Sequence, residues 1–330
     1  MGVLLTALQR SLGARATGQL ALGTLAFAAV CLIVAMSPVR AETRFRVTLL
    51  GTGTPLASAT RFGPSTLVEA GDQILLFDAG RGVPIRLAQL HIPSAKINLL
   101  FLTHYHSDHT SGIADIWLTG WTTGGGGRKA PFQVIGPTGA DALMRNLEKA
   151  YAKDVEIREL DENLPPEGAK IDVKEFDSDT VVYEKNGVRV TAFSVDHGPK
   201  IKPSYGYRID YGGHAAVISG DTRFSPNLIR HAAGADLVVH EVMADPVGPL
   251  TPALKAIMDH HSSPRDAGRV FDAVKPKLAA YTHIIAPDDP AAADQLIKAT
   301  RETYSGPLEV GADLTSFDIG NTVIVHHGAP

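Results

Sequence analysis

Three histidines and one carboxylate fall within six residues of the heptapeptide THYHSDH, at positions 103–109. His104 and His106 alternate, so their side chains point the same way in an extended segment. Asp108 and His109 lie where the chain turns, and they can face a second point nearby. Imidazole and carboxylate together suit zinc, iron or manganese. The heptapeptide therefore predicts metal ligands, against the alternative of a solvated polar loop.

The segments on either side would place the heptapeptide on a strand-to-helix loop. Residues 97–102 are mostly apolar and predict a short buried strand. After the heptapeptide, Thr110 and Ser111 offer hydroxyl groups that can cap a helix. Apolar side chains then recur at helical spacing, at Ile113, Ile116 and Trp117.

Other predicted strands end in the same kinds of residue. Besides the strand before the heptapeptide, such strands end at His197, at Asp221, at His240 with Glu241, and at His283. Strands of one sheet system deliver their carboxyl ends to a common edge, where α/β folds form their sites. One such ending means little, but packing alone is a poor explanation for their repetition. The pattern therefore favours one shared site.

The candidate ligands divide into two sets around one shared carboxylate. Asp221 follows a tight glycine turn and is the natural bridge between two metals. The first set is His104, His106 and His197, and the second set is Asp108, His109 and His283. Two such metals lower the pKa of a shared water, so that a bridging hydroxide exists near neutral pH, and they clamp the attacking and leaving oxygens.

The composition limits the partners and the chemistry. The formal net charge is −4 and no long Lys/Arg run appears, whereas nucleic-acid-binding proteins usually present a basic face. We therefore expect a small-molecule ester substrate rather than a nucleic acid. Cys31 is the only cysteine and precedes the expected mature chain. Catalysis by cysteine and metal binding by cysteine are thus excluded there.

The N-terminal segment has the pattern of a secretory signal peptide. Arg10 and Arg15 precede an apolar run over 20–36, and Val39 and Ala41 give a small-x-small cleavage pattern. We expect a signal peptide at 1–41, a mature hydrolase domain at 42–330, a periplasmic or secreted location, and no stable membrane partner after cleavage. An uncleaved membrane anchor is the alternative, because the run is nearly long enough to span a bilayer.

Three other segments carry weaker signals. The glycine-rich loop at 51–55 lacks the spacing of a nucleotide fingerprint and predicts a tight structural turn. Asp78 follows a predicted hairpin strand and is expected to hold loop amides near the site, with metal ligation as the alternative. Residues 139–152 predict a helix, and the acidic segment 154–185 predicts an edge hairpin or a lid.

The motifs together resemble the metallo-β-lactamase superfamily, and within it the ribonuclease Z and arylsulfatase-like branch. The matching pieces, in family order, are residues 50–55, 77–80, 103–109, 196–197, 219–222, 240–241, 261–263 and 282–283. The resemblance implies an α/β fold, a four-layer αβ/βα sandwich, with two zinc ions at the sheet edges; manganese or iron are alternatives. Relatives in this branch are often dimers, which makes a homodimer an expectation here.

The resemblance also assigns roles beyond metal binding. It implies that His261 donates a proton to the leaving group, and it places His240 and Glu241 in a supporting network. His260 is the neighbour that could be confused with His261, which is preferred because two serines follow it directly. Asp108 would orient the hydroxide and take its proton.

Departures from the family pattern narrow the expected activity. Asp221 stands where true β-lactamases carry a cysteine ligand, which argues against antibiotic hydrolysis. The long basic arm with which ribonuclease Z enzymes grip tRNA has no clear counterpart. We expect an exported binuclear zinc hydrolase of sulfate ester or phosphodiester bonds. The alternatives are a lactonase, a ribonuclease Z-like endoribonuclease or phosphodiesterase, a redox iron protein, and a non-catalytic binding protein.

Overall fold

The structure is a computed structural model that describes residues 44–122, 127–246, 248–287 and 289–328. The expected signal peptide at 1–41 lies outside the described residues, so cleavage and export stay predictions. Among the helices that are described, none is both long and apolar enough to cross a membrane.

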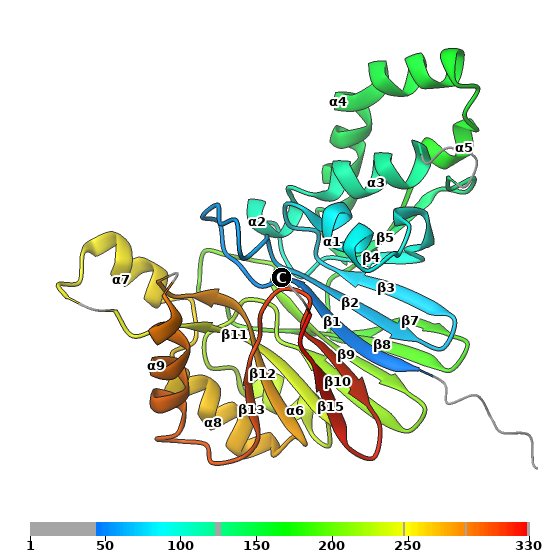
Figure 1. Ribbon diagram of the computed structural model, residues 1–330. Coiled ribbons are helices and arrows are strands. Elements are labelled where there is room, and N and C mark those ends of the chain that lie inside the picture. Colours follow the sequence, from blue (N-terminus) through cyan, green and yellow to red (C-terminus); the bar gives the residue numbers. More distant parts are fainter. Residues whose placement is uncertain (1–43, 123–126, 247, 288, 329–330) are drawn as a thin grey trace, which may run out of the picture. The chain divides into compact units, whose positions relative to one another are not determined.

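The first sheet has the spatial order β15-β14-β1-β2-β3-β4-β5-β6 (Figure 1). Its strands are β1 (Phe45–Gly51), β2 (Ser65–Ala70), β3 (Gln73–Phe77), β4 (Leu99–Phe101), β5 (Phe132–Pro137), β6 (Ile171–Phe176), β14 (Ser316–Ile319) and β15 (Val323–His326). Pairing is antiparallel from β15 to β3 and parallel from β3 to β6. The carboxyl ends of β3 and β4 therefore meet at one edge, where Asp78 and the heptapeptide follow them.

The second sheet has the order β13-β12-β11-β10-β9-β8-β7. Its strands are β7 (Thr180–Lys185), β8 (Val188–Ser194), β9 (Tyr205–Tyr211), β10 (His214–Ile218), β11 (Leu237–Met243), β12 (Leu278–Ile285) and β13 (Leu308–Val310). Strands β10 to β13 are parallel, and β8 runs in the same direction because β9 is antiparallel to both β8 and β10. His197 and Asp221, which follow β8 and β10, are thereby brought to the same edge.

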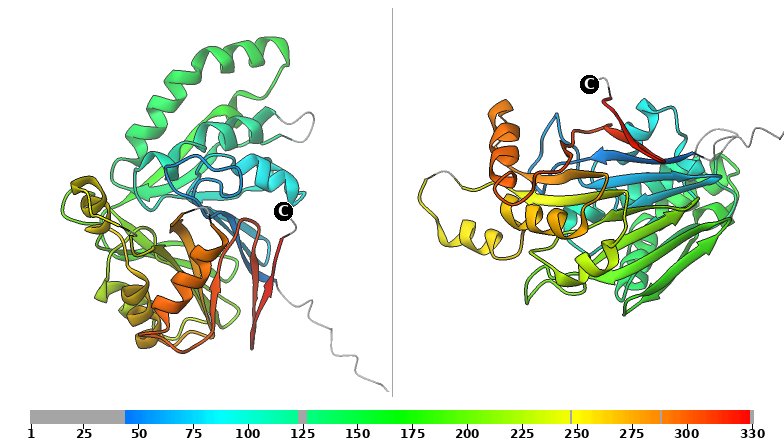
Figure 2. Two further views of the ribbon diagram at one scale, coloured as in Figure 1. Left: turned by 60° about the vertical axis from the view of Figure 1, so that its left-hand side comes forward. Right: turned by 90° about the horizontal axis from the view of Figure 1, so that it is seen from below.

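Helices cover the outer faces of both sheets, as Figure 2 shows from two sides. The helices are α1 (Val83–Gln89), α2 (Ser107–Thr110), α3 (Ile113–Thr122), α4 (Ala140–Asp161), α5 (Pro166–Ala169), α6 (Pro226–Ala232), α7 (Pro252–Met258), α8 (Pro264–Val274) and α9 (Pro290–Thr300), with a 3-10 turn η1 (Ser94–Lys96). Buried side chains form one core between the sheets, one under α1, α3 and α4, and one under α6, α8 and α9. The expected four-layer αβ/βα sandwich is confirmed.

The acidic segment 154–185 differs from its prediction. Helix α4 continues to Asp161 instead of ending near 152, and its last turns carry the ion pairs of Arg158 with Asp154 and Glu162, which support a helix at this spacing. Strands β6 and β7 do not form a hairpin, because β6 pairs with β5 in the first sheet and β7 with β8 in the second. This segment therefore crosses between the two sheets.

The glycine-rich loop after β1 is a structural turn, as predicted. A Cβ atom at Gly51 would lie 1.9 Å from the Gly63 carbonyl oxygen, so a side chain cannot fit there. The Asp313 carboxylate, whose side chain is 4% exposed, accepts hydrogen bonds from the Thr52 amide and hydroxyl and from the Arg86 guanidinium. The Thr52 carbonyl in turn accepts the amide of Ile284, the residue after His283. The loop thus braces the end of β12.

Candidate metal centre

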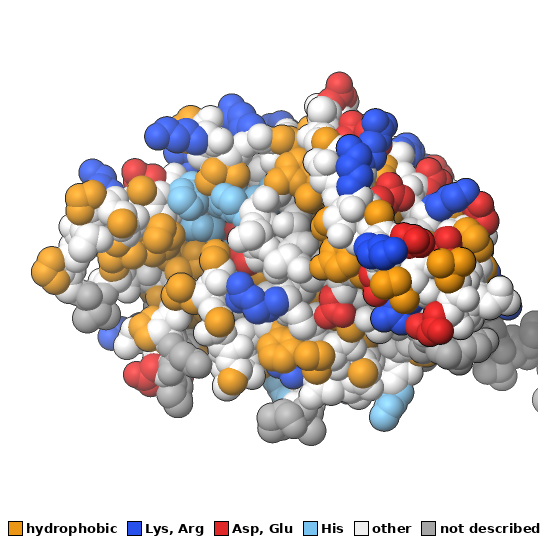
Figure 3. Space-filling model, turned by 90° about the horizontal axis from the view of Figure 1, so that it is seen from above, with side chains coloured by type: hydrophobic (Ala, Val, Ile, Leu, Met, Phe, Trp, Pro, Cys, Tyr) orange, Lys and Arg blue, Asp and Glu red, His pale blue; other side chains and the backbone are white. Residues whose placement is uncertain are grey.

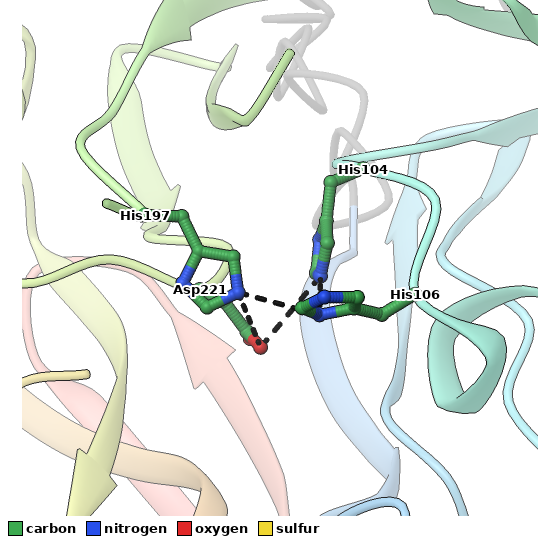
Figure 4. Close-up of side chains that lie close together, drawn as sticks. All are labelled: His104, His106, His197 and Asp221. Atoms are coloured by element: carbon green, nitrogen blue, oxygen red, sulfur yellow. Dashed lines mark hydrogen bonds and ion pairs between the residues drawn. The ribbon is translucent and has the colours of Figure 1, made fainter. Parts of the chain in front are cut away.

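Four side chains from both sheets converge where the strands end (Figure 4). His106 Nδ1 lies 3.0 Å from His104 Nε2 and 3.3 Å from His197 Nε2. Asp221 Oδ2 lies 3.8 Å from His104 Nε2 and 3.7 Å from His197 Nε2. The structure therefore brings together the first predicted ligand set with its shared carboxylate.

The second predicted set converges on the same carboxylate oxygen. His283 Nε2 lies 3.2 Å from Asp108 Oδ2 and 3.3 Å from Asp221 Oδ2. His109 Nε2 lies 3.6 Å from Asp108 Oδ2 and 3.4 Å from Asp221 Oδ2. Asp221 Oδ2 thus faces both sets, which is the position expected of a bridging ligand.

Helix α3 begins at Ile113, as the apolar spacing predicted, but a short helix that was not predicted, α2, precedes it. Helix α2 starts at Ser107, inside the heptapeptide, with His106 at the N-cap position. The Thr110 hydroxyl does not cap a helix but donates to the His106 carbonyl at 3.0 Å. Asp108 and His109 lie on a helical turn, so their side chains point in another direction than that of His104. This turn directs them toward His283, the third member of their set.

His283 also reaches the centre through a local irregularity. Strand β12 does not end before His283 but continues to Ile285. Glu241 pairs with Thr282 and Val242 with Ile284, so His283 is the extra residue of a bulge and has φ +41°. A bulge re-aims a side chain within a strand, which here points the His283 imidazole at the site.

A single carboxylate, Asp78, orients one ligand of each set. Its Oδ1 accepts the Thr103 amide at 2.8 Å, and its Oδ2 accepts the Thr103 hydroxyl and His109 Nδ1, each at 2.7 Å. Since the Thr103 hydroxyl gives its only proton to Asp78, it can only accept from His104 Nδ1, 2.9 Å away. Both imidazoles therefore carry their proton on Nδ1 and turn an Nε2 lone pair toward the centre.

The role of Asp78 agrees with the expectation that it holds loop backbone near the site. Thr103 is the positioning residue that the sequence reasoning missed, because a threonine before a histidine carries no signal of its own. His197 has an equivalent partner, since its Nδ1 donates to the His260 carbonyl at 2.8 Å. Three imidazoles are thus fixed with Nε2 free to bind a cation.

The geometry fits a divalent metal at each set. For zinc–nitrogen distances of about 2.0–2.1 Å, tetrahedral ligand atoms lie about 3.3 Å apart, and the distances above scatter around that value. Within the described residues, the buried atoms Asp108 Oδ1 and His109 Nε2 have no hydrogen-bond partner. Buried polar atoms without partners are costly. The lone pairs of His104 and His197 both face His106 Nδ1, whose single proton could satisfy only one of them.

Burial and the carboxylates have opposite effects on the imidazoles of the centre. Burial holds the pKa of His104 well below its usual range and lowers the pKa of His197 to about 4, so both are neutral ligands. Burial also opposes protonation of His109, but the Asp221 and Asp78 carboxylates raise its pKa well above its usual value. A proton on His109 therefore takes the place that a cation would occupy, and metal binding would displace it.

His261 lies beside both ligand sets. Its ring centroid is 5.0 Å from that of His197 and 5.4 Å from that of His283. Glu241 Oε1 accepts hydrogen bonds from His261 Nδ1 at 3.0 Å and from the amides of Thr222 and Ser262. Burial lowers the pKa of His261, but the Glu241 carboxylate outweighs it and raises the pKa to about 9. The arrangement presents a protonated imidazole to the centre.

His240, which was expected in the supporting network, lies outside the clusters of candidate metal ligands and bonds to Glu241 through the backbone carbonyl. Strand β11 runs through to Met243 instead of ending at His240. Adjacent residues of a strand point to opposite faces, so Glu241 reaches His261 while His240 faces α8. Its ring lies 5.7 Å from that of Phe271, and its Nδ1 donates to the Glu241 carbonyl. The sequence pattern could not locate the end of this strand.

Comparison with known proteins identifies the family. The family model described as "Anti-Pycsar protein Apyc1" matches residues 45–250. A curated ribonuclease Z of Mycobacterium marinum is 35% identical over 278 residues, which cover 83% of this chain and 98% of that protein. The chain belongs to the Apyc1 family and to the ribonuclease Z branch of the metallo-β-lactamase superfamily. Proteins of this fold bind divalent metals, and the chain is a metal-dependent hydrolase of ester or phosphodiester bonds.

Solved structures share the fold at lower sequence identity. The metallo-β-lactamase fold protein YhfI from Bacillus subtilis aligns with a TM-score of 0.66 and 21% identity, over 83% of this chain and 98% of that one. The short form of human tRNase Z aligns with a TM-score of 0.62 and 20% identity, over 83% and 99% of the two chains. Zn²⁺-bound PqqB from Methylobacterium extorquens aligns with a TM-score of 0.58 and 17% identity, over 83% of this chain and 100% of that one.

Replacement of Asp78 by asparagine tests the positioning network. The amide nitrogen of Asn would place a donor either against the Thr103 amide or against both the Thr103 hydroxyl and His109 Nδ1–H, so the network that orients ligands of both sets is disrupted. We expect Asp78→Asn to weaken zinc affinity by about 10- to 100-fold, measured by titration against a competing chelator. Asp318→Asn is the matched control, because Asp318 pairs with Arg46 near the start of β1. Unchanged zinc affinity in Asp78→Asn would refute the network.

Proposed function

We propose that this chain is a binuclear metal-dependent phosphodiesterase. The observation that carries the proposal is the pair of ligand sets that share Asp221 Oδ2. Curated relatives named ribonuclease Z support a phosphodiester substrate. From the sequence, sulfate esters stand beside phosphodiesters as expected substrates, with a ribonuclease Z-like activity as an alternative; the relatives favour that alternative. Two zinc ions are the proposed metals, because imidazole and carboxylate ligands suit zinc.

The side chains around the centre can supply the proton transfers. Divalent metals at the two sets would polarise a phosphoryl group and lower the pKa of a bound water. Asp108 orients the attacking water and accepts its proton, and its Oδ1 has no hydrogen-bond partner among the described residues. His261 gives a proton to the leaving oxygen, and Glu241 holds His261 Nδ1 so that Nε2 is the nitrogen that can reach substrate.

The charge of the projecting helix supports a small phosphodiester rather than a long RNA. Helix α4 extends away from the sheets (Figure 1). Residues 140–170 carry eight Asp and Glu side chains against five Lys and Arg, and four of the five cations form ion pairs within this segment. A polyanion is gripped through unpaired Lys and Arg, and among the described residues of this segment only Lys149 has no ion pair. We therefore propose a small-molecule diester as the substrate.

A matched pair of substrates tests the proposed reaction. Bis(p-nitrophenyl) phosphate and p-nitrophenyl sulfate release the same leaving group, so the difference in rate reports the reacting centre. With the zinc-loaded full chain, we expect kcat/KM to be about tenfold or more higher for the phosphodiester, and a chelator to abolish the activity. A higher kcat/KM for the sulfate would contradict the proposal. Cleavage of a structured RNA faster than the small diester would contradict the proposed substrate size.

Replacement of His261 tests the proton donor. His261→Ala should lower kcat by about 10²- to 10⁴-fold on alkyl phosphodiesters, whose leaving oxygen needs a proton, and much less on p-nitrophenyl esters. Zinc content should stay unchanged. His240→Asn is the control, because an Asn amide can keep the bond to the Glu241 carbonyl and His240 faces α8. An equal loss on both kinds of ester would exclude the donor role.

A further inference from the structure

His260 lies where an exposed helix returns to the centre. No residue of α7 is buried, and the helix ends just before His260, whose amide donates to the Ile257 carbonyl at 3.2 Å. The His260 backbone already has a role, because its carbonyl accepts the proton of His197 Nδ1. A Cβ atom at Gly198 would lie 3.1 Å from His260 Cβ, so the loop after His197 packs closely against it. The residue is therefore fixed in place by its main chain.

The side chain of His260 faces the ligand sets. Its ring centroid lies 5.0 Å from that of His197 and 4.7 Å from that of His261. A nitrogen of each of the three rings lies within 4.8 Å of the others. Figure 3 shows histidine side chains reaching the surface between hydrophobic ones, and His260 is only half-buried. A molecule that enters the centre can thus touch this ring.

The His260 ring has no internal task that would explain its place. The rings of His104, His109, His197 and His261 each have an orienting partner. Within the part of the chain that the structure describes, neither ring nitrogen of His260 forms a hydrogen bond. Each predicted metal set is complete without it. A half-buried imidazole with a free N–H at the mouth of a site is suited to bind substrate.

We propose that His260 is a substrate-binding residue, which donates an N–H hydrogen bond to a phosphoryl oxygen of the diester and of the released phosphate product. The unprotonated phosphoryl oxygens of a diester only accept hydrogen bonds. A neutral imidazole has one N–H donor and a protonated imidazole has two. The inference rests on the proposed phosphodiesterase function for the identity of the ligand. The rival role for the same ring is that of a metal ligand, because His197, His260 and His261 could together hold an ion.

Binding of inorganic phosphate to the zinc-loaded full chain, measured by calorimetry, tests this role without turnover. Loss of one neutral hydrogen bond of about 1 kcal/mol corresponds to about fivefold in Kd. We expect His260→Ala to weaken phosphate binding by about fivefold and His260→Gln, which keeps an N–H donor, to recover part of the loss. His214→Ala should bind phosphate like the unmodified chain. His214 lies at the opposite end of β10 from Asp221. Its partner Asp236 also pairs with Lys277, and this ion pair remains when His214 is replaced.

Zinc content, measured on the same samples, separates the two roles. Side-chain variants leave the carbonyl bond to His197 in place, so zinc content should not change. Unchanged phosphate affinity in His260→Ala would overturn the proposal, and so would loss of a zinc ion, because His260 would then be a ligand. If the unmodified chain hydrolyses no phosphodiester but its phosphate affinity depends on His260, the proposed function fails while the binding role stands.

Discussion

The centre depends on one carboxylate oxygen, Asp221 Oδ2, which lies 3.3–3.8 Å from a nitrogen of four imidazoles. Two of these imidazoles, His104 and His109, come from the first sheet, and two, His197 and His283, come from the second. Neither sheet can build the site alone. The buried core between the sheets therefore does more than stabilise the fold, because it sets the distance between the two halves of the centre.

The order of apolar strands and polar strand ends was sufficient to predict which side chains lie together, whereas the four layers followed from the family resemblance. Each ligand follows or closes an apolar strand, and parallel strands must deliver these ends to one edge. Thr66 to Phe77, for example, reads as a hairpin from its apolar runs and its Gly-Asp turn, and it forms one. These predictions succeed because they depend on local periodicity, which a single sequence displays.

Other features depend on contacts that a single sequence does not display. His240 looked like a strand end because the residues around it gave no sign that β11 continues to Met243. The bulge that re-aims His283 is a mismatch of register between β11 and β12, and it exists only once the strands pair. Thr103 orients His104 through Asp78, 25 residues away in the chain. Strands β6 and β7 are close in sequence, yet each finds its partner in a different sheet.

Metal analysis of the purified, zinc-equilibrated chain shows whether Asp221 bridges two metals. We expect two zinc ions per chain in the unmodified protein and weaker binding of both in Asp221→Asn. Asp210→Asn, which alters a surface carboxylate paired with Arg208, should keep both ions. One ion per chain in the unmodified protein would contradict a bridging role of Asp221, as would an Asp221→Asn variant that retains one ion at unchanged affinity.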